Sequence, residues 1–411
     1  MSAASGAAAA KPRPAIWTAG FRPFFLATAL WAICAVALWL ALLTTGLTLP
    51  SRFDPLTWHI HEMLFGFVMA AVGGFLLTAI PNWTKRPPVG GAPLVLLAGF
   101  WLLGRIVCLT SGLMPAWLSI AADLAFPVTL LVVAAREIVA GRNWRNLPMV
   151  LPAALLGAAN LLMHLEANGV AVSPGLGWRL GLATTIVLIS VIAGRIVPTF
   201  TRNWLTKRGV ADLPPTNGWI DRGALGLLHV GLIGWVVLPE FAPVGALLLF
   251  AAALNCARLH RWRGRATMAE PLLFILHLGY AWMVAGSALL GLSMLGWGVP
   301  QTAALHALTV GAFGTMILAV MTRATLGHTG RTLTANRATA AIYVSIAFAA
   351  LLRLVAAFGL GPFMPILVAS GCLWIVAFSL FARAYGPMLL SDRTVPAPAK
   401  RSTGLRSSPP Q

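Results

Sequence analysis

The chain has 411 residues, is 59% hydrophobic and 9% charged, and has a mean hydropathy of +0.84. Soluble domains carry about 25% charged residues, so this composition excludes a soluble globular protein and indicates one that is embedded in lipid. The formal net charge of +19 would suggest nucleic-acid binding in a soluble protein. Here the basic residues lie in connections between apolar segments, as is typical of the cytoplasmic loops of membrane proteins. No nucleic-acid partner is therefore expected.

Twelve apolar segments are long enough to cross a bilayer core of about 30 Å, which takes about 20 residues per helix. We therefore predict an all-α, polytopic membrane bundle. Its transmembrane helices are expected near residues 24–45, 58–81, 92–110, 114–135, 148–167, 178–199, 219–238, 241–257, 271–291, 302–322, 338–358 and 364–385. Little chain remains for another domain. We predict one transmembrane domain over 21–388, a disordered N-terminus at 1–20 and a disordered basic tail at 389–411.

Basic residues gather after alternate spans, whereas the connections between them carry almost none. The clusters after the second to tenth spans are Lys85 and Arg86; Arg136, Arg142 and Arg145; Arg202, Lys207 and Arg208; Arg258, Arg261, Arg263 and Arg265; and Arg323, Arg331 and Arg337. Because cytoplasmic loops are enriched in Lys and Arg, this distribution places both termini in the cytoplasm.

Short similar stretches close the fourth, eighth and twelfth spans: AAREI, CARLH and FARAY. Their arginines, Arg136, Arg258 and Arg383, lie at a nearly constant spacing. Self-similarity at a fixed period indicates a repeated structural unit. The sequence therefore predicts three quasi-repeats of four helices each.

Ionisable residues within spans are costly and mark functional sites by default. His61 and His306 occur on the second and tenth spans, each about one turn inside the outer surface, and Arg105 and Arg353 have similar depths on the third and eleventh. Two histidines on separate helices can supply the axial ligands of a haem iron, and arginines suit its propionates. The pattern predicts a b-type haem between repeats one and three.

Two residues along a helix turn it by about 200°, so His59 and His61 cannot face the same way. Either His59 precedes the helix or the two histidines serve different centres. Copper is the second interpretation, with a low-specificity set of candidate ligands: His59, Glu62, His164 and His229. The four cysteines contain no C-x-x-C motif, and we expect them to be small buried side chains.

Four longer motifs resemble the NnrS family over most of the chain. They are GFRPFFL (20–26), WHIHEMLFGFVMAAVGGFLLTAIPNW (58–83), GRIVPTFTRNWL (194–205) and LHALTVGAFGTMILAVMTRATLGHTGR (305–331). The resemblance implies a bacterial inner-membrane protein with twelve spans that contains haem and copper. It also implies a role in denitrification and in tolerance of nitric oxide and nitrosative stress, without specifying a reaction.

The predicted architecture also looks like haem–copper oxidase subunit I, where histidines on the second and tenth spans hold the low-spin haem. His61 and His306 match those positions. The sixth span, TTIVLISVIAGRIVPTF, has no histidine or tyrosine, and the seventh has one histidine. The copper site of that family is therefore missing, so oxygen reduction coupled to proton pumping is not expected, and the likeness is one of architecture.

Three classes of function remain open from the sequence. The leading one is a membrane haem protein that acts on, binds or senses nitric oxide or a related small molecule, with a membrane electron donor as partner if it is a redox enzyme. The second is a twelve-helix transporter of a small solute such as a nitrogen oxide or copper. The third is an assembly factor for another metalloenzyme.

Overall fold

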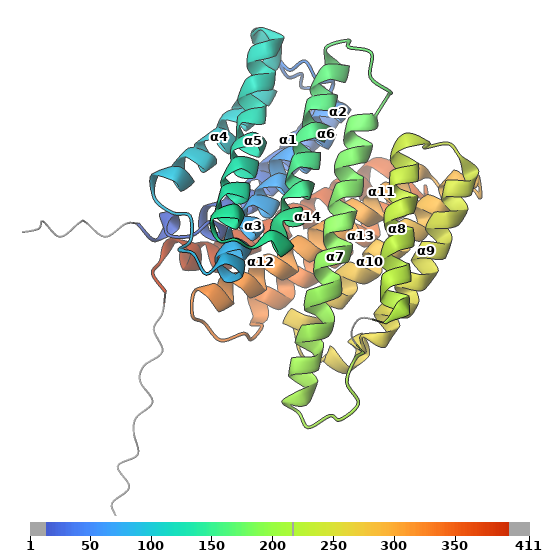
Figure 1. Cartoon of the computed structure of the whole chain (residues 1–411). Coiled ribbons are helices and arrows are strands. Elements are labelled where there is room, and N and C mark those ends of the chain that lie inside the picture. Colours follow the sequence, from blue (N-terminus) through green and yellow to red (C-terminus); the bar gives the residue numbers. More distant parts are fainter. Residues whose placement is uncertain (1–13, 216–217, 394–411) are drawn as a thin grey trace, which may run out of the picture.

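The computed structural model describes residues 14–215 and 218–393, and these residues form helices without a strand (Figure 1). In that part of the chain, twelve helical stretches are long and apolar enough to span a membrane, as predicted. In order they are α1 (Phe21–Thr45), α2–η2–α3 (Pro55–Thr84), α4–η3 (Ala92–Leu113), α5 (Ala116–Ala140), η4–α6 (Trp144–Ala167), α7 (Leu176–Thr206), α8 (Trp219–Val237), α9 (Ala242–Arg261), α10 (Pro271–Met294), α11–η6–α12 (Gln301–His328), α13 (Arg337–Ala357) and α14 (Phe363–Leu390).

The first and last helices of the bundle pack against each other. Arg22, in the first turn of α1, donates hydrogen bonds to the carbonyl oxygens of Leu389 (2.9 Å) and Ser391 (2.6 Å) at the end of α14. The start of α1 and the end of α14 therefore lie side by side, as an even number of spans requires (Figure 1). We predicted disorder at 1–20 and 389–411, and most of these residues lie outside the described part of the chain. Of those that are described, Ala15–Trp17 form a 3₁₀ turn, η1.

The second and tenth spans are each interrupted by a π-helical segment directly after a histidine. In the second span, α2 (Pro55–His61) is followed by η2 (Glu62–Val68) and α3 (Met69–Thr84). In the tenth, α11 (Gln301–His306) is followed by η6 (Ala307–Gly314) and α12 (Thr315–His328). π-helical segments are rare and frequently mark functional sites. This correspondence is consistent with the predicted equivalence of the two spans.

The start of the second span is set by its capping residues. The Asp54 side chain accepts hydrogen bonds from the backbone N–H groups of Leu56 (3.0 Å) and Thr57 (3.2 Å), and Pro55 occupies the first helical position. Both features are typical of helix N-termini. Since α2 begins at Pro55, His59 and His61 both lie on the helix and point from different faces.

Buried polar contacts also occur between the start of α8 and the end of α9. Arg258 on α9 pairs with Asp221 on α8 (2.9 Å) and donates to the hydroxyl of Tyr280 on α10 (2.9 Å). These contacts link three consecutive spans, so they stabilise the packing of α8, α9 and α10. They lie on helices that contribute no histidine to the sites described below.

Candidate functional site

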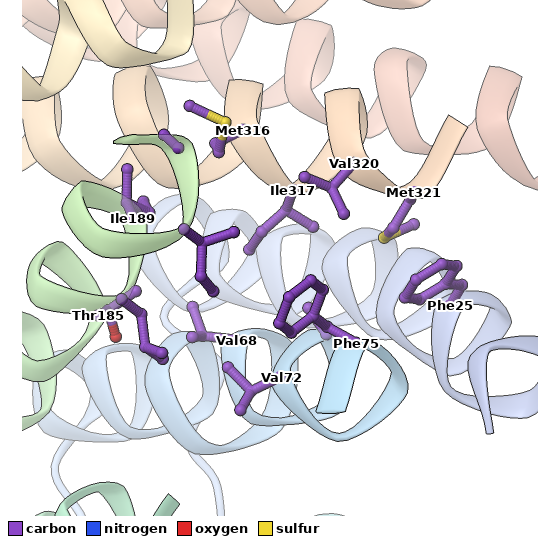
Figure 2. Close-up of a pocket in the computed structure, with 14 residues that line it drawn as sticks. Phe25, Val68, Val72, Phe75, Thr185, Ile189, Met316, Ile317, Val320 and Met321 are labelled. Carbon is purple, nitrogen blue, oxygen red and sulfur yellow. The ribbon is translucent and has the colours of Figure 1, made fainter. Parts of the chain in front are cut away.

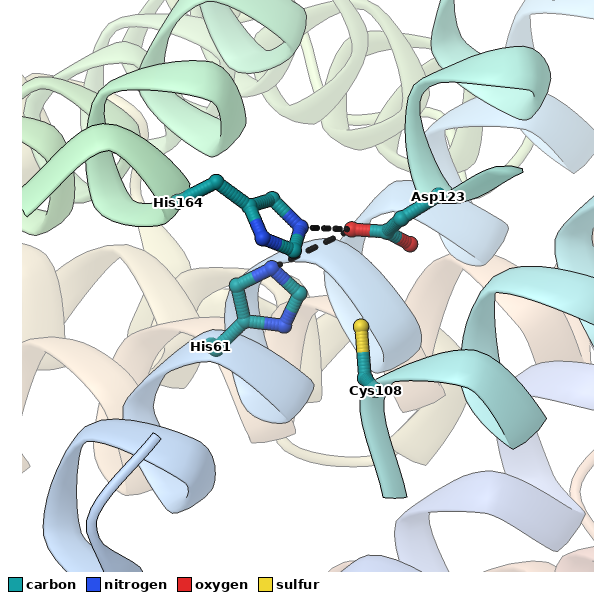
Figure 3. A group of neighbouring side chains, drawn as sticks. All are labelled: His61, Cys108, Asp123 and His164. Carbon is teal, nitrogen blue, oxygen red and sulfur yellow. Dashed lines mark hydrogen bonds and ion pairs between the residues drawn. The ribbon is translucent and has the colours of Figure 1, made fainter. Parts of the chain in front are cut away.

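Four buried side chains from four spans meet near the outer end of the bundle. They are His61 of α2, Cys108 of α4, Asp123 of α5 and His164 of α6, and one ligand atom from each lies within 4.8 Å of all the others (Figure 3). None of the four is more than 2% exposed. Imidazole nitrogen, thiolate sulfur and carboxylate oxygen are the donors that bind transition metals in proteins. We call this set the metal-ligand group.

Asp123 lies at the centre of the group. Its Oδ2 atom is 3.2 Å from Nε2 of His61 and 3.1 Å from Nε2 of His164 (Figure 3). The same oxygen accepts a hydrogen bond from the side-chain amide of Asn160 (2.8 Å). Because both imidazoles direct Nε2 toward one oxygen, their lone pairs can converge on one ion.

A second layer of contacts orients these side chains. Glu62 Oε1 lies 3.1 Å from Nδ1 of His61, on the side of the ring away from Asp123. Carboxylates in this position fix the tautomer and orientation of metal-binding histidines. Phe53 stacks on the His61 ring with centroids 4.6 Å apart and contacts His164. Since Phe53 is itself buried, it covers both imidazoles with an apolar surface.

Arg105 binds both carboxylates of this region. Its guanidinium forms an ion pair with Glu62 (2.7 Å) and another with Asp123. When both carboxylates are ionised, one arginine balances only one of them, and a buried charge without a counter-charge is costly. A bound cation would supply the missing positive charge. The residues present therefore fit a metal ion in charge as well as in donor type.

Two glycines allow this close packing. A Cβ atom at Gly104 would collide with the Asp123 carboxylate, and one at Gly66 would collide with the Trp31 indole and lie 3.0 Å from Arg105. Both positions therefore require the smallest side chain where the spans approach each other. The carbonyl group of Gly66 also accepts a hydrogen bond from Trp101 (2.9 Å).

A separate cavity of about 420 Å³ lies on the other side of the second span. Roughly 300–1,000 Å³ is usual for small-molecule and cofactor sites. Its polar lining includes His59, His306 and Arg353, and most of the remaining lining is apolar or aromatic. Both π-helical segments contribute to its wall, through Met63 and Leu64 of η2 and Thr309 and Phe313 of η6, among others. We call it the histidine cavity.

The polar groups of the histidine cavity have unused bonding capacity. In the described part of the chain, Nδ1 of His59 and Nη1 of Arg353 are buried and have no hydrogen-bond partner. Nδ1 of His306 donates to the carbonyl oxygen of Thr302 (2.7 Å), which leaves the Nε2 lone pair of that ring free. The His59 ring stacks on Trp39 with centroids 4.6 Å apart. Unpaired buried polar atoms are rare, so these groups fit a ligand.

The structure separates residues that the sequence analysis grouped together. His306 and Arg353 line the histidine cavity with His59, whereas His61 and Arg105 belong to the metal-ligand region. His61 and His306 are therefore not brought together as a pair, and the Arg105 guanidinium is taken up by two carboxylates. His59 lies on the helix rather than before it, and it lines the histidine cavity, whereas His61 belongs to the metal-ligand group.

The proposed copper ligands are also divided between places. Glu62 and His164 lie in the metal-ligand region and His59 in the histidine cavity. His229 lies apart, with Nε2 3.1 Å from the Ser190 hydroxyl. His277 bonds to Leu273 and Thr201 near the inner end of α10, which is a structural arrangement.

Sequence reasoning missed Cys108, Asp123 and Asn160 as site residues. The expectation of four buried cysteines is wrong, because Cys34, Cys256 and Cys372 are exposed and only Cys108 is buried. A usable signal existed in helical spacing: Cys108 follows Arg105 by three residues, and His164 follows Asn160 by four. Residues at these spacings share a helix face.

The fold and these sites define a multi-pass membrane protein with a buried metal-ligand group beside a histidine-lined cavity. The model of the NnrS protein family matches residues 15–393, which is most of the chain. The chain therefore belongs to the NnrS family, in agreement with the resemblance of its motifs. No curated protein matches the sequence significantly.

Proposed function

We propose that this chain is a haem- and copper-binding protein of the bacterial inner membrane, with a role in the response to nitric oxide that is linked to denitrification. Membership of the NnrS family supports the nitric oxide response. The observation that carries the haem assignment is the histidine cavity, where His59, His306 and Arg353 present unused polar atoms in a largely apolar space.

In this proposal His59 and His306 would hold the haem iron, and Arg353 would pair with a propionate. A b-type haem supplies one-electron exchange and diatomic-gas binding. The protein's own part is orientation: the stack on Trp39 holds the His59 ring, and the Thr302 carbonyl holds the tautomer of His306. The remaining lining is largely apolar or aromatic, which suits the macrocycle of a haem. A membrane electron donor is needed if the reaction is redox.

An optical spectrum of the purified full-length protein tests this proposal. We expect sharp bands of a low-spin b haem after dithionite reduction, because two imidazole ligands give a low-spin iron. Nitric oxide can bind only if one of the two imidazoles leaves the iron, and its addition should then change the spectrum. A reduced spectrum that nitric oxide leaves unchanged would contradict the gas-binding role. A preparation without haem would contradict the cofactor and favour transport of a small solute, which uptake into proteoliposomes would then test.

We assign copper to the metal-ligand group, with His61, His164, Cys108 and Asp123 as ligands. Imidazole and thiolate donors suit copper, and a thiolate ligand favours its reduced form. Zinc accepts the same donors, so elemental analysis of the purified protein decides between the two metals.

Replacing Cys108 with serine should lower the affinity for Cu(I) with little effect on folding, because serine preserves the side-chain size but removes the soft sulfur donor. A competition titration with a chromophoric Cu(I) chelator measures the change. Cys372→Ser, at an exposed cysteine, is the matched control. Equal Cu(I) affinity in the two variants would exclude Cys108 as a ligand.

A further inference from the structure

A second cavity, of about 90 Å³, lies at mid-span between α3, α7 and α12 (Figure 2). Its lining is apolar apart from Thr185, and the labelled side chains include Val72, Phe75, Ile189 and Ile317. The Thr185 hydroxyl is already bonded to the carbonyl oxygen of Gly181 (2.9 Å). The space therefore offers no free polar partner to hold a water molecule. We call it the apolar cavity.

The apolar cavity adjoins the histidine cavity. Val68 lines both. On three different helices, residues about one turn apart line the two cavities. Leu64 lines the histidine cavity and Val72 the apolar cavity, with Val68 between them. In the same way Leu182 and Phe313 line the histidine cavity, and Thr185 and Met316 line the apolar cavity. The two cavities are therefore neighbours between the second, sixth and tenth spans, with Val68 in the wall between them.

The size and lining restrict what the apolar cavity can admit. At about 90 Å³ it is much smaller than the histidine cavity of about 420 Å³, so it cannot hold a second macrocycle. It is only partly enclosed, and it lies at mid-span, where the surroundings of a transmembrane bundle are lipid. Ions and polar solutes find no partner there, whereas a small neutral molecule dissolved in the bilayer does not need one.

We propose that the apolar cavity binds a small, uncharged, apolar gas on its way from the lipid to the histidine cavity. The ligand class is a neutral diatomic molecule, and the inference rests on the proposed function for the identity of the gas and its destination. Val68 lines both cavities, and Phe313 and Met316 on the facing span line one each. In this proposal the gas would pass between these three side chains.

Xenon is the probe for this site, because it occupies dry apolar cavities without needing a polar partner; an engineered cavity of about 150 Å³ in another protein binds it. Crystals of the full-length protein under xenon pressure should show anomalous density between Val72, Ile189 and Ile317. In Ala71→Leu the longer side chain should fill the cavity and remove that density. The matched control is Ala79→Leu, at a half-buried position of the same helix that lines neither cavity.

The functional readout is the rate of nitric oxide association with the haem-loaded protein, followed by stopped-flow absorption. Ala71→Leu should slow association relative to Ala79→Leu while leaving the haem spectrum unchanged. Val72→Trp, at a half-buried position in the cavity wall, provides a second obstruction if Ala71→Leu does not fold. Xenon absent from the wild-type cavity, an acyl chain in its place, or association rates unaffected by both obstructions would each overturn the proposal.

These outcomes separate the inference from the function on which it rests. Xenon density does not depend on haem, so a protein that binds xenon at this site but no haem would contradict the proposed function and retain the gas site. A protein that binds haem and nitric oxide but no xenon would contradict the gas site and retain the proposed function.

Discussion

Asp123→Ala should abolish binding of the metal ion and destabilise the protein strongly. The substitution removes the oxygen that both imidazoles approach and leaves Arg105 with one of its two carboxylate partners. Arg105 keeps Glu62 as its counter-charge, but the buried amide of Asn160 and one side of the guanidinium lose their partner. A buried polar group left without a partner costs about 1–3 kcal/mol. The expected result is metal-free protein by elemental analysis, together with a lower midpoint of thermal unfolding in detergent.

Asp221→Ala is the matched control for that experiment. Asp221 also pairs with a buried arginine, Arg258, at 2.9 Å, but it lies outside both candidate sites. This variant should lose stability and keep its metal. Asp123→Asn tests the charge separately, since it preserves the shape of the side chain and removes the anion. A full complement of metal in Asp123→Ala would exclude Asp123 as a ligand and refute the assignment of the group.

His59→Ala and His306→Ala should each lose most of the bound haem and retain the metal ion of the other group. His61→Ala and His164→Ala should show the opposite pattern. The physical reason is that His59 and His306 line the histidine cavity, whereas His61 and His164 converge on Asp123 on the other side of the second span. Haem content by the pyridine haemochrome assay and metal content by mass spectrometry, measured on the same samples, give both readings.

His277→Ala is the control for a histidine outside both sites and should keep both cofactors. If His61→Ala lost haem while His59→Ala kept it, the pair expected from the sequence, His61 and His306, would be correct. The assignment of His59 to the haem and of His61 to the metal ion would then be wrong. Loss of both cofactors in all four variants would mean that the two groups form one cooperative unit.

The local sequence determined the membrane architecture of this protein. Each span is read from some 20 apolar residues, because every backbone polar group in lipid must be satisfied within its own helix. The predicted division between the spans at 219–238 and 241–257 is confirmed, with α8 ending at Val237 and α9 beginning at Ala242. The two candidate ligand histidines of the second span were also visible, since ionisable side chains are rare among apolar residues.

The sequence could not show which side chains share a site. That depends on helix phase and on which spans pack together. Placing His59 and His61 in different sites follows from the start of α2 at Pro55, and the π-helical segment after His61 changes the phase of every later residue in the span. An error of one residue in either feature turns a side chain by about 100°, from the histidine cavity toward the metal-ligand group.

Only the tertiary structure showed that Cys108, Asp123 and Asn160 belong with His61 and His164. Each comes from a span where it is one polar or weakly polar residue among many apolar ones. Their meeting depends on the close approach of neighbouring spans at Gly66 and Gly104. The sequence thus determined which segments cross the membrane and where ionisable residues enter it, because these are local energetic requirements. The assignment of those residues to two sites was decided by packing between helices, which no local pattern specifies.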